Sequence, residues 1–308
     1  MKRILVSIIA CSVAASAAQA QGGNEQKSGT AGASELLINP WAQSSGMANA
    51  HTAGVKGVEA IRLNVGGLSR VTNTEVVFSS TQWLKGSDVP INAIGMAQPI
   101  GENGGVLGFE VMGMNLGEFY ATTVNSPDGN ATFDVNYLNL GLSYSKAFSN
   151  SIFGGITVRG VSESIPNARA VGVCFDAGVQ YVTSVGPRED SKNLRIGVSL
   201  RNVGPAMQFS GDGLDKRVNI LTGNMAQEEI TTQMPTEEME LPSQLNIGAA
   251  YDFALAEQHR LTLAGNFSSN SFTLDQFQGG LEYAFMERFM VRGGLDYQKN
   301  VFKLQTNF

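Results

Sequence analysis

Cysteine is almost absent from this chain. Only two of its 308 residues are cysteine, and Cys11 lies in the N-terminal apolar run, so an exported chain would keep only the thiol of Cys174. One thiol excludes an intrachain disulfide, and one Cys with two separate histidines, His51 and His259, cannot supply the ligands of a zinc site. We therefore expect stability to come from packing, and we expect no metal and no other cofactor.

Positive charge is the second scarcity. The chain carries 21 Lys and Arg against 27 Asp and Glu; without Lys2 and Arg3 at the N-terminus, 19 oppose 27 and the net charge is −8. No basic cluster offsets this balance, which excludes nucleic acid as a partner. Catalytic patterns are missing too, since no Ser/His/Asp spacing, paired carboxylates or phosphate loop stands out. We predict that the chain is not an enzyme.

Long apolar runs are confined to the N-terminus. Mean hydropathy is −0.04, which argues against a helical membrane protein. Lys2-Arg3, the apolar run Ile4–Ala17 and Ala18-Gln19-Ala20 follow the order of a secretory signal. This order predicts a signal peptide over 1–20, and the Gly- and Ser-rich composition that follows predicts a flexible start over 21–35.

Alternation with a period of two residues dominates the remainder of the chain. It is clearest between Tyr137 and Val203, where the first apolar row is Leu138, Leu140, Leu142 and Tyr144. Successive side chains of a strand point to opposite faces, so each such segment has one apolar face and one polar, small-residue face. Similar segments continue to Phe308, and weaker ones precede at Glu75–Leu84, Ile91–Gln98 and Val106–Met114. We predict an all-β, antiparallel fold.

Charge is restricted to one of these two faces. From Leu138 onward the apolar rows hold no charge, whereas the opposite rows hold Arg159, Asp176, Arg195, Arg201, Asp252, Arg260, Glu282, Arg292 and Asp296. Short connections such as Ser149-Asn150 also alternate with longer ones such as Ser162–Arg169 and Gly204–Ser243. Both regularities are typical of a transmembrane β-barrel with short periplasmic turns and longer external loops. The apolar rows would face outer-membrane lipid, and the inward charges would either pair across a filled lumen or line a selective channel.

The segment 36–70 lacks this alternation. It combines small residues with Pro40, Trp41, Gly46 and Met47, and we predict a short helical plug at the periplasmic end of a barrel formed by 71–308. If Phe119–Phe133 is a hairpin tip with its turn at Ser126–Gly129, the barrel has twelve strands, of which Val301–Phe308 is the last.

Four short stretches carry a resemblance to a known family: Leu36–Ala50, Ala60–Leu68, Arg201–Pro205 and Leu241–Gly248. In this order they resemble the PorV/PorQ family of Bacteroidetes outer-membrane proteins, within the wider FadL-like barrel group. Gln43 stands where that family has Arg, and Val65 where it has Pro. Barrels of the group typically have fourteen strands, so the resemblance widens the expected range to 12–14.

The resemblance implies a component of the type IX protein secretion system. Members bind the C-terminal signal domain of cargo proteins, dock beside the translocon barrel and pass cargo to the sortase-containing attachment complex. The external loop Gly204–Ser243 would then contact a partner through Met207, Phe209, Leu214, Met234, Glu237, Glu238 and Met239. The same loop could equally be a solvated acidic covering.

A FadL-type transporter of hydrophobic small molecules is the alternative function. Such a transporter needs an apolar path through the lumen, and the nine inward charges argue against one. The polarity of the lumen therefore distinguishes the two candidate functions.

Overall fold

The computed structural model describes residues 27–83, 86, 89–101, 104–124, 126–186, 192–222, 226–298 and 301–306. The predicted signal peptide lies outside the described residues, as do residues 21–26 of the predicted flexible start and Phe308. No described helix is both long and apolar enough to cross a membrane.

Antiparallel strands make up most of the described chain. They are β1 (Glu75–Gln82), β2 (Pro90–Pro99), β3 (Val106–Thr123), β4 (Ser126–Ala147), β5 (Ile152–Ile165), β6 (Ala168–Thr183), β7 (Leu194–Val203), β8 (Phe209–Ser210), β9 (Asp215–Thr222), β10 (Ala226–Gln233), β11 (Gln244–Ala256), β12 (His259–Asn270), β13 (Gln276–Phe285), β14 (Phe289–Gln298) and β15 (Val301–Thr306).

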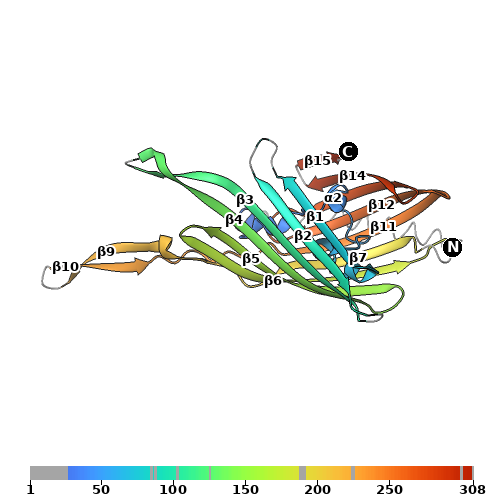
Figure 1. The fold of residues 1–308 in the computed structure, drawn as a ribbon, viewed down its shortest axis with the longest axis horizontal. Coiled ribbons are helices and arrows are strands. Elements are labelled where there is room, and N and C mark those ends of the chain that lie inside the picture. Colours follow the sequence, from blue (N-terminus) through green and yellow to red (C-terminus); the bar gives the residue numbers. More distant parts are fainter. Residues whose placement is uncertain are drawn as a thin grey trace.

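Twelve of these strands form one continuous wall. Their order is β1-β2-β3-β4-β5-β6-β7-β11-β12-β13-β14-β15; β8 pairs with β6 beside them, and β9 and β10 form a separate pair. Figure 1 shows the tilted strands curving round a group of short helices, with the β9–β10 hairpin projecting from one end. The predicted class, an antiparallel β-barrel of 12–14 strands, is confirmed. Within the described residues, no pairing joins β1 to β15.

The barrel has two unlike ends. The end that we call the short-turn end carries the connections β2–β3, β4–β5, β6–β7, β11–β12 and β13–β14. The opposite end, the long-loop end, carries the tips of β3–β4 and β5–β6 and the excursion 204–243 between β7 and β11.

Two predicted connections are wrong. The predicted turn Ser126–Gly129 lies inside β4, which pairs with β3 as far as Thr123↔Ser126, and the register shifts there accommodate Gly129 at φ 78°. The predicted loop Ser162–Arg169 is mostly strand, because β5 continues to Ile165 and β6 begins at Ala168, which leaves only Pro166 and Asn167 as the turn. Both hairpins extend beyond the apolar part of the wall. Polar residues occur on both faces of the strands there, so the sequence lacks the apolar–polar alternation that predicts a strand.

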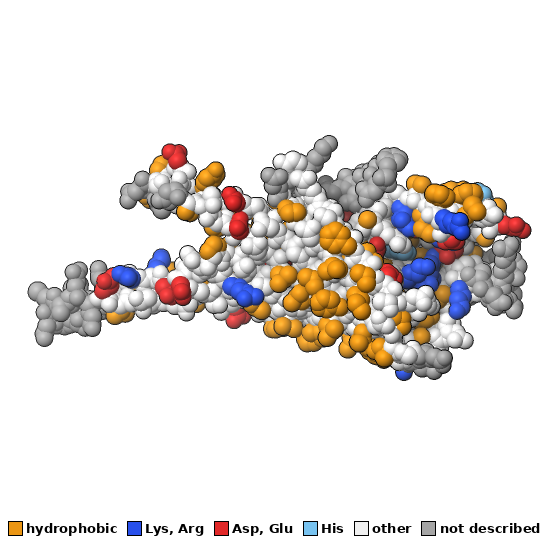
Figure 2. All heavy atoms as spheres, viewed as in Figure 1, with side chains coloured by type: hydrophobic (Ala, Val, Ile, Leu, Met, Phe, Trp, Pro, Cys, Tyr) orange, Lys and Arg blue, Asp and Glu red, His pale blue; other side chains and the backbone are white. Residues whose placement is uncertain are grey.

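The outer and inner faces of the wall follow the alternation in the sequence. Along β6, buried and exposed residues alternate strictly from Ala168 to Val182. The mid-row residues Leu138, Val173, Ile196, Ile247 and Leu281 are 41–46% exposed on the outside. Figure 2 shows hydrophobic side chains gathered in a band across the middle of the wall, with charged side chains toward the two ends. An exposed apolar band of this extent is typical of a lipid-facing surface.

The N-terminal segment, residues 27–74, lies inside this wall. It contains η2 (Ser34–Leu37), α2 (Ala42–Ser45), α3 (Ala60–Leu63) and η3 (Val65–Arg70). Almost every residue from Met47 to Leu68 is buried. Short helices and turns suit this position because the lumen walls satisfy the backbone groups that a four-residue helix leaves free.

Candidate functional site

The N-terminal segment runs through the lumen from one end of the barrel to the other. At the long-loop end, the Gly32 amide donates to the Glu240 carbonyl oxygen at 3.0 Å and the Ala33 amide donates to Glu163 Oε1 at 2.8 Å. Deeper in, the Asn64 amide group donates to the Val179 carbonyl oxygen at 3.1 Å. The segment thus fills the lumen along its length, whereas the sequence placed it at the periplasmic mouth. Ala33 is buried, although the sequence placed it in a flexible start.

An apolar layer joins one side of this segment to strands β1 to β3. We call it the apolar seam; its buried residues are Trp41, Val55, Val58, Ala60, Ile61, Leu63, Val65, Leu68, Val89, Ile91, Ala93, Ala97, Val106, Met112 and Met114. The contact is close because Gly95 presents no side chain: a Cβ built there would lie 2.3 Å from Val58 Cγ1. The β1–β3 side of the lumen is therefore largely apolar, with carboxylates at the edge of the seam: Glu75 on β1 and Glu110 on β3.

Glu110 is a fully buried carboxylate at the edge of the seam. Its carboxylate accepts from Arg62 Nε at 2.9 Å and Trp41 Nε1 at 3.1 Å, both on the N-terminal segment, and from Arg159 Nη1 on β5 at 2.8 Å. Arg159 Nη2 continues to Asp176 Oδ2 on β6 at 3.1 Å. These groups are almost fully buried, so their charges are compensated by one another and not by solvent.

A second ion network lies toward the short-turn end. Arg195 on β7 bonds Asp252 on β11, and Arg260 on β12 bonds Glu287 at 2.7 Å and Glu282 at 3.0 Å. Arg292 on β14 reaches Glu282 at 2.6 Å.

The remaining predicted lumen charges sit apart from this network. Arg201 Nη1 donates to Gln244 Oε1 at 3.1 Å, and Asp296 lies on β14 opposite Gln278. The nine predicted inward charges therefore lie on β5 to β7 and β11 to β14. Of these, Arg159 reaches the edge of the apolar seam through Glu110 and the Ile61 carbonyl oxygen.

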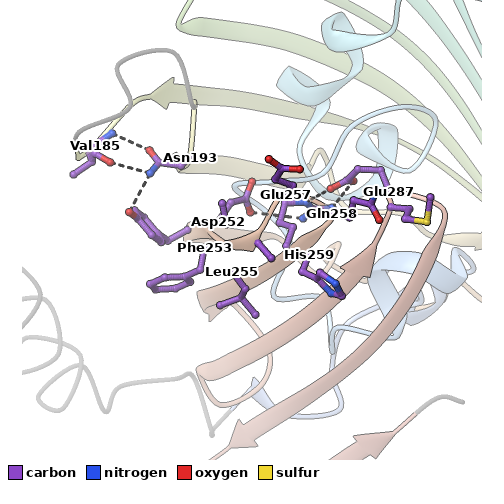
Figure 3. Close-up of a pocket in the computed structure, with 14 residues that line it drawn as sticks. Val185, Asn193, Asp252, Phe253, Leu255, Glu257, Gln258, His259 and Glu287 are labelled. Atoms are coloured by element: carbon purple, nitrogen blue, oxygen red, sulfur yellow. Dashed lines mark hydrogen bonds and ion pairs between the residues drawn. The ribbon is translucent and has the colours of Figure 1, made fainter.

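Two cavities open at the short-turn end. The outer one, the rim recess, measures about 940 Å³ and is lined by Val185, Asn193, residues 251–260, Met286 and Glu287. Figure 3 shows Phe253 and Leu255 to one side of β11 and Asp252 on the other, with Asn193 bonded to Val185 and to Tyr251. The inner one, the inner chamber, measures about 270 Å³ and shares Asp252, Arg260 and Glu287 with the recess. Its other walls include the N-terminal segment.

His51 and Glu35 are buried ionisable groups on the N-terminal segment. Burial and then the positive charges of Arg195 and Arg292 lower the pKa of His51 to about 3, so the imidazole is neutral. Burial and then the carboxylate of Glu163 raise the pKa of Glu35 to about 8. The two ends of the lumen therefore contrast: Glu35 faces another acid at the long-loop end, and His51 faces arginines at the short-turn end.

The excursion 204–243 is only partly available to a partner. Met207 is 2% exposed, and its backbone pairs with Met239 through bonds of 2.9 and 2.8 Å. Together with Phe209, these residues pack on an apolar cluster formed by Ala33, Leu36, Val161, Ala170, Cys174 and Leu241. Met207 is thus not a contact residue, because it closes the long-loop end over the N-terminal segment. Leu214 is half-buried, and Met234, Glu237 and Glu238 are exposed.

The predicted plug residues all contact the wall or their own segment. The Pro40 carbonyl oxygen accepts from Ser79 Oγ at 2.6 Å, and Trp41 lies in the apolar seam. Met47 packs with Ala250 and Ala264, and the Gly46 amide donates to the Ala42 carbonyl oxygen at 2.9 Å.

Sequence reasoning missed Glu110, Arg62 and both cavities. Glu110 could have been found, since it is the single charge in the inward row of an otherwise apolar and small-residue stretch of β3. The cavities could not, because they depend on how a non-alternating segment sits in the lumen.

Comparison with known proteins identifies the fold. No protein-family model and no curated protein matches the chain. Among solved structures, the CymD monoaromatic hydrocarbon channel matches with a TM-score of 0.51 at 11% identity, covering 93% of this chain and 86% of that one. The Pseudomonas putida toluene transporter TodX gives 0.49 at 11% identity, covering 82% and 81%.

At this identity the likeness to CymD concerns the fold alone. The chain has a FadL-like β-barrel fold, which is the coarser part of the resemblance in its sequence. The PorV/PorQ family and type IX secretion receive no support from these comparisons.

Proposed function

We propose that the chain is an outer-membrane barrel that gives small hydrophobic molecules a path through its lumen, with the N-terminal segment closing that path. In this proposal residues 1–20 are the export signal, residues 36–70 of the N-terminal segment are the plug and 71–308 are the barrel. The exposed apolar band of the wall supports the membrane location. The fold shared with CymD, a monoaromatic hydrocarbon channel, supports small hydrophobic molecules as the transported compounds.

The observation that carries the proposal is the apolar seam. The nine inward charges argued against an apolar path, but all nine lie on β5 to β7 and β11 to β14, and none of them belongs to the seam. A shift of the N-terminal segment away from β1 to β3 would open a path between two apolar surfaces. A hydrophobic molecule would enter such a path favourably, because its apolar surface would leave water for apolar side chains.

The test is uptake of a labelled monoaromatic hydrocarbon by Gram-negative cells that carry the chain in their outer membrane. Two variants place a carboxylate at matched alanines, each 2% exposed and on the inner face: Ala93→Glu in the seam and Ala250→Glu in the separate cluster with Met47. Heat-modifiable mobility on gels reports that both barrels assemble.

The expected result is faster uptake with the parent chain than with an empty vector, lost in Ala93→Glu and kept in Ala250→Glu. Equal uptake by cells with and without the parent chain would contradict the proposal. Equal loss in both variants with assembled barrels would place the path elsewhere in the lumen.

A role in type IX secretion is the second candidate function, and the projecting hairpin favours it. Within the described residues, strands β9 and β10 pair with each other and with no strand of the wall, and they extend beyond it, where Val218 and Ile230 are exposed. Such a hairpin can reach a translocon barrel, a cargo signal domain or the attachment complex. Replacing 215–233 with a short Gly-Ser linker keeps the buried Met207 and the partly buried Met239. This role predicts that the change stops cargo secretion while the barrel still assembles, and unchanged secretion contradicts it.

A further inference from the structure

The inner chamber holds more positive than negative charge. Its lining contains Lys56, Arg70, Lys192, Arg195 and Arg260 against Asp252, Glu282 and Glu287. Each of the three carboxylates already bonds an arginine of the second ion network. Figure 2 shows Lys and Arg side chains gathered at this end of the molecule, opposite the β9–β10 hairpin.

Arg70 lines the chamber but has no carboxylate partner in this network. It donates to Gln180 Oε1 at 3.4 Å and lies over the Phe153 ring at 5.8 Å, and no ion pair joins it to a carboxylate of the described residues. Burial and then the charge of Arg195 lower its pKa, so its charge is poorly compensated. Lys56, at the exposed side of the chamber, likewise has no ion pair within the described part of the chain.

Buried polar atoms without partners lie in the same walls. His51 is 6% exposed and lines the chamber, and its Nδ1 has no hydrogen-bond partner in the described structure. Arg195 is 9% exposed and its Nε is also unpartnered there. Buried polar groups are normally satisfied, so two such atoms beside one cavity indicate a missing polar partner, and the Nε–H of Arg195 needs an acceptor.

We propose that the inner chamber is a binding site for a small oxyanion, a carboxylate or a phosphate, held by Arg70 and Lys56. The guanidinium fork of Arg70 suits the two oxygens of either group, and the flexible Lys56 adds a point charge from the mouth. His51 completes the site, since its Nδ1 can donate to an anion oxygen once the imidazole takes that tautomer or a proton. The chamber volume of about 270 Å³ limits the ligand to a small one.

This site lies apart from the apolar seam, and its occupancy does not depend on transport. Arg70 and Lys56 line the chamber, whereas neither belongs to the seam. An anion there would neutralise the charge at the short-turn end and tie the N-terminal segment to the wall.

The test is isothermal titration calorimetry of the full chain in detergent, with inorganic phosphate in one arm and succinate in the other. Both are titrated against a constant chloride background. We expect saturable one-to-one binding in at least one arm, which also identifies the preferred oxyanion. Arg70→Gln removes one charge-assisted contact and should weaken the affinity for the oxyanion about tenfold or more. Lys56→Gln should weaken the affinity less. Arg217→Gln removes a charge from the exposed β9 and should bind as the parent does.

Binding should also raise the pKa of His51, which the ring-proton NMR signals report. No saturable binding in either arm overturns the proposal. So does equal binding by the parent and by Lys56→Gln and Arg70→Gln. Lys56 is exposed, so Lys56→Gln keeps the test decisive if Arg70→Gln fails to fold. Because the measurement is made at equilibrium in detergent, its failure leaves the proposed hydrocarbon path untouched.

Discussion

Removing the carboxylate of Glu110 is expected to loosen the N-terminal segment from the barrel. Glu110→Gln keeps the shape of the side chain but leaves Arg62 without its carboxylate, while Arg159 keeps Asp176 at 3.1 Å. The Arg62 and Glu110 side chains are 0% exposed, so solvent cannot compensate the charge that remains. Breaking a buried ion pair by removing one partner costs about 3–5 kcal/mol. That cost corresponds to a loss of roughly two to three and a half orders of magnitude in the docking equilibrium.

Tryptophan fluorescence during urea titration measures this loss. Trp41 is 1% exposed and donates to Glu110, so its emission reports release of the segment into water. Glu110→Gln should lower the urea midpoint of this change, whereas Glu229→Gln, which loses an exposed pair at 3.7 Å, should change it little. In the double variant Glu110→Gln/Arg62→Met the orphaned charge is gone, and much of the stability should return. A Glu110→Gln midpoint equal to that of Glu229→Gln would refute the reasoning.

The remaining predictions concern the wall and the pH response. Cysteines placed at Leu138 or Ile247, in a Cys174→Ala background, should resist a water-soluble maleimide in lipid vesicles, because these positions lie in the outer apolar band. The same cysteines should react in the unfolded chain. Rapid labelling in vesicles would contradict the lipid-facing assignment. Glu35 is neutral in the folded chain up to a pKa of about 8, above its ordinary 4.5, so the stability that it adds is complete below pH about 4.5 and is lost as the pH rises toward 8. Protease cleavage near Glu35 should therefore increase over that range in the parent and stay constant in Glu35→Gln; a parent without this rise would contradict the assigned burial.

The wall could be predicted from sequence because its strands carry an alternation of apolar and polar residues that is visible within each strand. The apolar row Leu138, Leu140, Leu142 and Tyr144 can face lipid only if the opposite row faces inward, and this alternation sets orientation and register together. The same rule failed at Ser126–Gly129, because a strand that extends beyond the apolar band needs no hydrophobic row there. The turn-forming residues Ser126–Gly129 therefore predicted a turn, whereas the structure has a register shift between β3 and β4 at this place.

The candidate site was less predictable because it depends on contacts between distant residues. Arg62 and Glu110 meet across 48 positions, and nothing in the local pattern of either residue identifies the other as its partner. The exposed methionines expected in 204–243 are another example, since Met207 is buried only because Leu36 and Cys174 lie beneath it.

The central claim is that the N-terminal segment closes an apolar path, and a reversible crosslink across the seam tests it most directly. Ile61→Cys/Gly108→Cys in a Cys174→Ala background joins the N-terminal segment to β3 across the seam, because a Cβ at Gly108 would lie 3.1 Å from Ile61 Cγ1, close to the separation of a Cβ from the far sulfur of a disulfide. Labelled-hydrocarbon uptake is compared before and after dithiothreitol, with Gly108→Cys alone as the control because it adds the same side chain to the wall without a crosslink. The account predicts uptake that is blocked in the oxidised double variant, restored on reduction and insensitive to dithiothreitol in the control. Equal uptake by the oxidised and reduced double variant, with the crosslink shown to have formed, would contradict it.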